Sequence, residues 1–363
     1  MVKLVWNNKQ RIDEFKHPQN FDDHFTEIHA QKKQENQVVS KREINASNLL
    51  FWEDNLTVLH YLVLDFKKKI DLIYIDPPFF SGTNYGLKIE HDGETYDSIA
   101  YNDHWNNDLD SYLQMLYERL VLFKELLSDK GLLFVHLDWH ASHYIRVMLD
   151  EIFGENRFVN SIVWYYYNKY SAGKRNVPRA HDDILVYSKT KNYTLNEIRI
   201  PRVKPIKQLK RVMVNGILKN AKDENGHVIY RTVSDKKLDD VWKIPCMQPA
   251  SKEWTGFPTQ KHHELLERIL LLGSNEGDLI ADFFCGSGTT LLTAEKLNRR
   301  WIGSDVSKFS IYLTRKRLMN YQQDRRNGEE IRNKFRILTH LTEEKEKTIN
   351  SGFFEKNIKF KRH

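Results

Sequence analysis

One stretch constrains this chain more than any other, an apolar run that ends in two consecutive prolines. Residues 71–75 have the composition of a buried strand, and Asp76-Pro77-Pro78-Phe79 follows directly. Each proline fixes φ and lacks a backbone donor, so neither a strand nor a helix continues through the pair. The sequence predicts a stiff corner that presents a carboxylate, free carbonyls and an aromatic ring. An open α/β sheet binds ligands at such strand ends, whereas a simple helix-capping turn is the plainer alternative.

Strands and helices alternate on the carboxyl-terminal side of this corner. Residues 110–127 carry leucines and aromatic residues at helical spacing, Gly131 is predicted to end that helix, and residues 132–137 resemble a buried strand. Such alternation is typical of an α/β fold with a mostly parallel sheet covered on both faces. Ser81–Asp108 is rich in Gly, Asn and Asp without helical periodicity, so we expect a long loop there.

Composition limits the class of protein. The 363 residues suit one large α/β domain with an insertion, or two domains. The net charge is +7 and the pI about 9.0, which favours a polyanionic partner if the positive charges cluster. The two cysteines, Cys246 and Cys285, exclude a disulfide framework and a cysteine-rich zinc site. We recognise no apolar leader and no membrane span, and therefore expect a cytoplasmic protein without a membrane partner.

Positive charge clusters in the middle of the chain. Residues 198–222 contain eight Lys and Arg residues and no acidic residue. A solvated surface normally mixes charges of both signs, whereas clustering of one sign favours contact with phosphate groups. No regular period emerges in this segment, so we predict neither helices nor strands for it. The residues expected to contact phosphate are Arg199, Arg202, Lys204, Lys207, Lys210 and Arg211.

A second motif lies later in the chain. Residues 279–305 are predicted to form a strand, a glycine-rich turn, a helix and a second strand that ends in an acid. Glycines in the turn let the backbone approach a ligand, and the helix amino end beyond Gly288 favours negative charge. Asp305 follows Asp282 by 23 residues, close to the spacing at which an acid binds ribose hydroxyls. The Gly-Lys-[Ser/Thr] of a nucleoside-triphosphatase loop and the third glycine of a dinucleotide-binding fingerprint are missing.

Together the two motifs resemble those of the S-adenosylmethionine-dependent amino-group DNA methyltransferases of the β group. Residues 76–79 are similar to the family's catalytic Asp/Asn/Ser-Pro-Pro-aromatic motif, and residues 284–290 to its Phe-x-Gly-x-Gly-Thr-Thr cofactor motif. Residues 257–261 resemble its Pro-Thr-Gln-Lys helix entry. Residues 53–56 resemble its Gly-Asp-Asn-Leu motif, with Glu53 in place of glycine. The catalytic motif precedes the cofactor motif, which is the permuted order of the β group.

The resemblance covers about residues 48–190 and 254–315, and residues 135–140 and 181–185 are similar to the modification subunits of type III restriction systems. It implies a doubly wound, mostly parallel, seven-stranded Rossmann-like methyltransferase sheet with an inserted target-recognition region. The expected parts are an N-terminal arm (1–45), a catalytic half of the methyltransferase domain (46–190), the target-recognition insertion (191–253), a cofactor-binding half (254–320) and a C-terminal extension (321–363).

The resemblance also implies a mechanism. An exocyclic amine is a poor nucleophile because its lone pair is delocalised into the base ring. The Asp76 carboxylate and the Pro77 carbonyl, in a corner stiffened by Pro78, are expected to accept both amino hydrogens. The nitrogen lone pair would then point at the sulfonium methyl group. Phe79 is expected to stack on a base that has been flipped out of the duplex.

The expected cofactor is S-adenosyl-L-methionine, and its contacts follow from the family motifs. Asp282 and the Gly286–Gly288 turn would line its methionine part, Asp305 would bind ribose, and Asp54 would lie near the adenine. Thr259 and Lys261 are expected near the methionine carboxylate. A helix N-cap for Asp54 and a plain helix start at residues 259–261 are the alternatives. The full expected set is Asp54, Phe257, Thr259, Lys261, Asp282, Phe284, Cys285, Gly286, Gly288, Thr289, Thr290 and Asp305.

Asp76 favours N6 of adenine as the methyl acceptor, because N4-cytosine members of the family usually carry serine at that position. N4-cytosine methylation, a catalytically silent DNA-binding partner of a restriction–modification complex, and methylation of RNA or protein amides are the alternatives. The resemblance implies double-stranded DNA as substrate, with a homodimer and a restriction subunit as further partners. We expect no metal, because His136 and His140 are separated by a strand end and have no suitable acidic third ligand.

Overall fold

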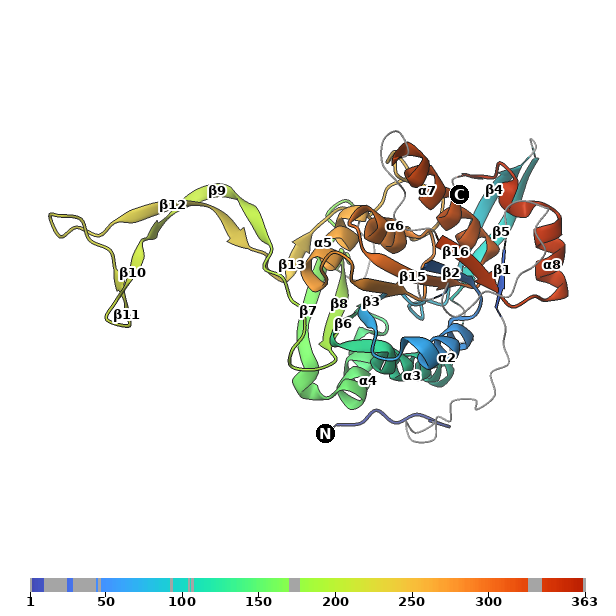
Figure 1. Ribbon diagram of the computed structural model, residues 1–363, viewed down its shortest axis with the longest axis horizontal. Coiled ribbons are helices and arrows are strands. Elements are labelled where there is room, and N and C mark those ends of the chain that lie inside the picture. The colour runs from blue at the N-terminus through green and yellow to red at the C-terminus, as the bar shows by residue number, and fades with distance from the viewer. Residues whose placement is uncertain are drawn as a thin grey trace.

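A ten-stranded sheet forms the centre of the protein in the computed structural model (Figure 1). The structure describes residues 2–9, 25–28, 44, 47–91, 94–103, 105, 108–169, 177–325 and 335–361. The sheet order is β1 (Thr26–Glu27), β16 (Phe335–Thr339), β2 (Asn48–Trp52), β15 (Arg300–Asp305), β14 (Leu279–Asp282), β3 (Ile70–Ile75), β6 (Leu127–Leu137), β8 (His181–Ser188), β7 (Phe158–Tyr165) and β13 (Val241–Lys243).

The six strands from β16 to β6 are parallel, and β8 runs antiparallel to both of its neighbours. This confirms the predicted doubly wound, mostly parallel sheet. The strands from β2 to β7 account for the seven expected strands, and β1, β16 and β13 extend the edges to ten. Two of these additional strands have only two or three residues, too few for a hydrophobic pattern to be recognised.

Helices cover both faces of the sheet. On one face lie α2 (Asn55–Phe66), α3 (Leu109–Leu126) and α4 (Ser142–Phe153), and on the other α5 (His263–Gly273), α6 (Thr289–Lys296) and α7 (Lys308–Arg325). Each layer buries its own apolar cluster against the sheet. Helix α3 confirms the helix predicted at residues 110–127. The prediction that Gly131 ends this helix is wrong, because β6 begins at Leu127 and contains Gly131.

The prediction of a long loop at Ser81–Asp108 is wrong. Strands β4 (Asn84–His91) and β5 (Glu94–Asn102) form an antiparallel hairpin, and β17 (Lys359–Lys361) pairs with the free edge of β4. Among the hairpin residues whose burial the structure describes, the buried apolar ones are Leu87, Ile89 and Ala100. The alternation is therefore weak, and the strand that completes this small sheet comes from the other end of the chain.

Between α7 and β17 lie β16, α8 (Glu343–Asn350) and the short 3-10 turn η3 (Phe353–Glu355). A second such turn, η2 (Glu155–Arg157), follows α4.

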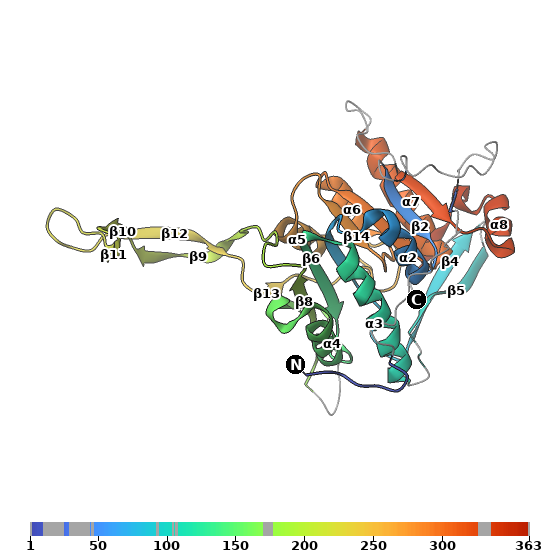
Figure 2. The same cartoon turned by 60° about the horizontal axis from the view of Figure 1, so that its bottom comes forward.

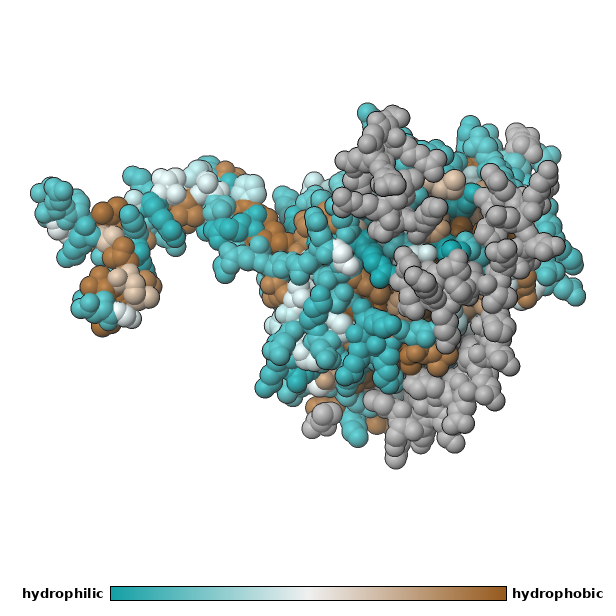
Figure 3. Space-filling view, viewed as in Figure 1, coloured by the Kyte–Doolittle hydropathy of each residue, from teal (hydrophilic) through white to brown (hydrophobic). Residues whose placement is uncertain are grey.

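A long ribbon projects from the sheet beside β13 (Figures 1 and 2). Its strands are β9 (Arg199–Leu209), β10 (Arg211–Val214), β11 (Ile217–Asn220) and β12 (Tyr230–Lys237), with β9 paired to β12 and β10 to β11. The expectation of no regular structure here is wrong. Most of its side chains are exposed on both faces, so no buried face imposes an alternating pattern. Figure 3 shows hydrophilic and hydrophobic residues interspersed along the ribbon.

Part of the expected N-terminal arm packs on the helical layer. The Trp6 ring contacts Tyr117 edge-on, with 5.4 Å between ring centroids, and the Trp6 indole N–H donates to Gln114 at 3.1 Å. Most of residues 10–46 lie outside the described part of the chain. Among the described residues, none of the helices combines the length and hydrophobicity that crossing a bilayer requires.

Candidate active site

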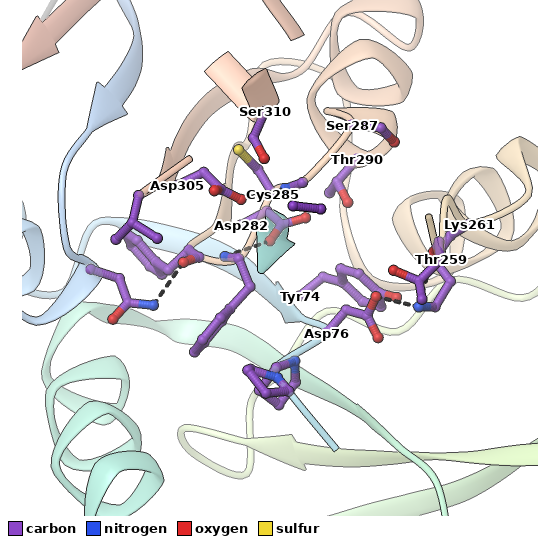
Figure 4. A pocket seen from close by; sticks show the side chains of 18 of the residues that line it. Tyr74, Asp76, Thr259, Lys261, Asp282, Cys285, Ser287, Thr290, Asp305 and Ser310 are labelled. Carbon is purple, nitrogen blue, oxygen red and sulfur yellow. Dashed lines mark hydrogen bonds and ion pairs between the residues drawn. The ribbon is translucent and has the colours of Figure 1, made fainter. Parts of the chain in front are cut away.

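A cavity of about 380 Å³ opens at the carboxyl ends of β3 and β14 (Figure 4). These two strands are neighbours, with Leu72 beside Ile280 and Ile73 beside Ala281. The strand order reverses here, because the chain proceeds from β3 toward β6 on one side and from β14 toward β15 on the other. Such a switch point is where open α/β sheets bind ligands. The cavity therefore lies between the proline corner and the glycine-rich turn.

The two motifs that the sequence analysis singled out meet in this cavity. All four corner residues, 76–79, line it. Eleven of the twelve residues expected to bind the cofactor also line it, and Gly288 does not. Gly288 instead has a φ of 73° at the start of α6, and a Cβ at that position would lie 2.5 Å from the Thr314 hydroxyl. Its role in the structure is therefore to allow close packing of the turn on α7.

Asp76 has two carboxylate oxygens in different environments. Oδ2 accepts an ion-paired hydrogen bond from the Lys261 ammonium, as Figure 4 shows. Oδ1 is buried, lacks a hydrogen-bond partner among the described residues, and lies 3.8 Å from His136 Nδ1. This ion pair was not predicted from the sequence, and the contact of Lys261 with the methionine carboxylate stays a prediction. One carboxylate oxygen of Asp76 is thus held by a cation, while the other is buried beside His136.

Hydrogen bonds also fix the backbone of the corner. The Tyr112 hydroxyl, from α3, donates to the Pro78 carbonyl at 2.8 Å. Burial, followed by the nearby carboxylates of Asp103 and Asp138, raises the Tyr112 pKa well above its usual value, so this hydroxyl keeps its proton. Within the described chain no hydrogen bond occupies the Pro77 carbonyl. The corner therefore offers two acceptors, Asp76 Oδ1 and the Pro77 carbonyl.

The glycine-rich turn is folded around two carboxylates. Asp305 accepts from the backbone N–H of Gly286 at 2.9 Å, and Asp282 accepts from that of Phe284 at 3.0 Å. Burial raises the pKa of Asp282 to about 7, and the charges of Asp76 and Asp305 add to the effect. Burial also raises the pKa of Asp305, although hydrogen bonds from the backbone oppose it. Three carboxylates thus converge on one small cavity, which creates a negative potential suited to a cationic ligand.

Asp54 forms the helix N-cap that the sequence left open, and its contact with the adenine of the cofactor stays a prediction. Its side chain caps α2 by accepting from the Leu56 N–H at 2.9 Å, and it also lines the cavity. Arg119 of α3 donates to the Asp54 carboxylate at 3.2 Å and was not foreseen as a site residue. Burial lowers the Arg119 pKa. Arg119 could have been recognised in the sequence as a single arginine on an otherwise apolar helix face. Such an arginine is expected to be buried, and a buried guanidinium needs a partner.

Further cavity residues were also missed by the sequence analysis, because they belong to elements that look purely structural. Tyr74 lies within the buried strand β3, Ser310 within α7, and Asn55 begins α2. Burial raises the Tyr74 pKa well above its usual value, and the Asp76 charge adds to the effect. The additional lining residues with polar side chains are Glu53, Asn55, Tyr74, Trp105, Arg119, Gln260, Ser287 and Ser310.

A second cavity, of about 540 Å³, adjoins the first. The two share the Phe79 ring and residues 257 and 259–261. The remaining walls include Trp164, Tyr166 and Asp182, together with residues 246, 247 and 249. The Phe79 ring and the Lys261 side chain therefore separate two adjoining chambers. Cys246, to which the sequence analysis assigned no role in a site, lines the second of them.

The histidine pair does not form a metal site. His136 is fully buried, with Nδ1 2.9 Å from the Tyr74 hydroxyl and Nε2 3.2 Å from Asp182. His140 instead contacts Asp138 at 2.6 Å. A search of the described residues finds no group of three or more His, Cys, Asp or Glu residues arranged to hold a metal ion.

The six residues expected to contact phosphate lie together on the projecting ribbon and line neither cavity. Arg199 pairs with Asp235 at 2.8 Å and with Glu197 at 3.0 Å, and Arg202 donates to the Asp235 carbonyl at 2.9 Å. The four others, at positions 204, 207, 210 and 211, are exposed. All six positive charges thus lie on the ribbon, but Arg199 and Arg202 are already bonded to nearby residues of the same chain.

Comparison with known proteins gives a consistent result. Residues 70–316 match the family described as DNA methylase. The type II methyltransferase M.EcaI of Enterobacter cloacae is 30% identical over 323 residues, which span 74% of this chain and 69% of that protein. The DNA adenine methyltransferase YhdJ of Escherichia coli K12 is 28% identical over 274 residues, 74% of this chain and 84% of that protein. The StyLTI Mod subunit of a type III restriction-modification enzyme from Salmonella typhimurium is 27% identical over 329 residues, 70% of this chain and 50% of that protein.

Proposed function

Because this chain belongs to the DNA methylase family, we propose that it transfers a methyl group from S-adenosylmethionine to N6 of an adenine flipped out of duplex DNA. The observation that supports this most strongly is the pair of adjoining cavities that share Phe79 and Lys261. One cavity contains the residues expected to bind the cofactor, and the other is large enough for a base. Asp76 and Pro77 line the first cavity, and Asp76 is ion-paired with Lys261, which lines both.

The chemistry of the first cavity suits the proposed cofactor. A volume of about 380 Å³ falls in the range of small-molecule sites. S-adenosylmethionine supplies an electrophilic methyl group on a positively charged sulfonium. The carboxylates of Asp76, Asp282 and Asp305 favour that positive charge, which the thioether product no longer carries.

The corner residues account for activation of the amine. Asp76 Oδ1 and the Pro77 carbonyl would accept the two amino hydrogens and so direct the nitrogen lone pair toward the methyl group. As the N–C bond forms and the C–S bond breaks, the sulfur keeps the bonding electron pair and the nitrogen loses a proton. Asp76 Oδ1, which has no hydrogen-bond partner among the described residues, would take that proton once the bound base reaches it. Phe79 stacks on the base, and a rigid, pre-formed corner avoids reorganisation during the reaction.

Support for adenine over cytosine comes from two sources. Asp76 occupies the position where N4-cytosine members of the family usually carry serine. YhdJ, one of the relatives of this chain, is named a DNA adenine methyltransferase.

The exposed lysines of the ribbon would contact the DNA backbone, and the domain division inferred from the sequence assigns that ribbon to target recognition. A homodimer, a restriction subunit as partner and a cytoplasmic location remain predictions.

Incubation of purified protein with plasmid DNA and labelled S-adenosylmethionine tests this proposal. Digestion of the DNA to deoxynucleosides should then show label in N6-methyl-2′-deoxyadenosine. Label in N4-methyl-2′-deoxycytidine alone would refute adenine specificity and favour the cytosine alternative. DNA binding without any methyl transfer would refute the proposed methyltransferase activity and favour a catalytically silent DNA-binding protein.

A further inference from the structure

The proline corner is held by a carboxylate that takes no part in the mechanism above. Asp103 follows β5 and is 1% exposed. Its Oδ2 accepts from the backbone N–H groups of Phe79 at 3.3 Å and Ser81 at 2.8 Å, and from the Ser81 hydroxyl at 2.5 Å. Its Oδ1 accepts from the Phe80 N–H at 3.0 Å. Three consecutive backbone donors thus converge on one side chain.

The corner needs such a partner. Two prolines supply no backbone N–H, so the segment after β3 cannot be tied into the sheet by a regular ladder. Phe80 adopts a φ of 61°, a left-handed conformation that is rare for an aromatic residue and persists only where its surroundings enforce it. Hydrogen bonds to a charged acceptor are stronger than neutral ones. Asp103 therefore stabilises a backbone conformation that the local sequence disfavours.

Asp103 is itself fixed in place. Its Oδ1 accepts from the Trp105 indole N–H at 3.2 Å, and its backbone N–H donates to the Thr83 carbonyl at 3.2 Å. The β4–β5 hairpin that precedes it is supported by β17, whose Phe360 pairs with Ile89 of β4. Asp103 lines neither cavity, so its influence on the reaction passes through the corner.

We propose that Asp103 is a positioning residue for methyl transfer, which sets the place of the Phe79 ring and of the corner acceptors relative to the target base. The inference rests on the proposed function. Misplacement of reacting groups by about 1 Å costs on the order of 100-fold in rate. Loss of the carboxylate should therefore affect the chemical step far more than the binding of either substrate.

Asp103→Asn tests this directly, because asparagine keeps the shape but has one acceptor oxygen and turns an NH₂ group toward an N–H donor. We expect the single-turnover rate with saturating DNA and cofactor to fall about 100-fold. The dissociation constants of cofactor and DNA should stay within about threefold of the wild-type values. Asp108→Asn is the matched control: Asp108 caps α3 and does not touch the corner, and asparagine is also a good N-cap, so the rate should not change.

Two further measurements cover the case in which Asp103→Asn folds poorly. Ser81→Ala removes one donor to Asp103 and should lower the single-turnover rate about fivefold. Hydrogen exchange at the amides of residues 79–81 should be at least about tenfold faster in Asp103→Asn than in the wild type, whether or not the protein methylates DNA.

A wild-type rate in Asp103→Asn, or an equal loss of rate, cofactor affinity and stability, would overturn the positioning role. Unchanged amide exchange in Asp103→Asn would also overturn it. If Asp103→Asn does not fold, an unchanged rate in Ser81→Ala would overturn it. Wild-type protein that transfers no methyl group to DNA would refute the proposed function instead, and the amide exchange still decides whether Asp103 fixes the corner.

Discussion

Replacing Asp282 by asparagine should stabilise the protein at alkaline pH while removing cofactor binding. Asp282 ends β14 at the base of the cavity and is 2% exposed. Burial raises its pKa from 3.8 to about 7, and the charges of Asp76 and Asp305 add to this. Hydrogen bonds from Thr290 and from the Phe284 backbone oppose the shift only in part. The ionised form of Asp282 is therefore destabilised in the folded protein.

The sign and size of the effect follow from linkage between protonation and folding. Because the folded-state pKa of Asp282 is raised, its protonation stabilises the folded state fully below about pH 3.8, and this contribution is lost as the pH rises through about 7. At 1.36 kcal/mol per pKa unit, the contribution falls by about 2 kcal/mol between pH 5.5 and pH 8. Asparagine does not titrate. The unfolding free energy of Asp282→Asn minus that of the wild type should therefore be about 2 kcal/mol larger at pH 8 than at pH 5.5.

Urea denaturation of the protein without added cofactor, at several pH values from 5.5 to 8, measures this difference. Asp324→Asn, which changes an exposed carboxylate on α7, controls for the general loss of one charge. Titration calorimetry of the same samples should show at least tenfold weaker S-adenosylmethionine binding by Asp282→Asn. A stability difference that does not change with pH would refute the argument that Asp282 is destabilised by burial in this cavity.

Three further outcomes are expected. Gly288→Ala should lose at least about 2 kcal/mol of unfolding free energy in chemical denaturation, because its Cβ would meet Thr314 at 2.5 Å in a left-handed conformation; a loss below about 0.5 kcal/mol would contradict this. Lys261→Met should lower the single-turnover rate about 100-fold, because Asp76 Oδ2 loses the cation that fixes it; an unchanged rate would show that the pair has no catalytic role. Lys207→Ala should weaken DNA binding and lower the slope of log affinity against log salt by about 0.9; an unchanged slope would exclude a phosphate contact there.

The corner and the glycine-rich turn could be predicted because their geometry is encoded locally. Consecutive prolines after residue 76 leave few backbone conformations, and glycines 286 and 288 adopt positive φ values that other residues disfavour. The parallel sheet was likewise predictable from alternating apolar segments. These features depend on neighbouring residues and not on the rest of the chain.

What could not be predicted depends on contacts between distant residues. The Lys261–Asp76 pair joins positions 185 residues apart, and Asp103 acts on a corner more than 20 residues before it. Arg119 was overlooked because a charged residue on a helix is ordinarily assigned to solvent. The ribbon escaped prediction for another reason: its strands are exposed on both faces, so no hydrophobic alternation marks them.

We propose that this protein methylates N6 of adenine in DNA through Asp76. Methylome sequencing of cells that express either the wild type or Asp76→Ala tests it most directly. The wild-type cells should carry N6-methyladenine at one recurrent DNA sequence, and the Asp76→Ala cells should lack it at the same sites. N4-methylcytosine as the sole new mark, or the same N6-methyladenine pattern in both cell lines, would contradict the claim.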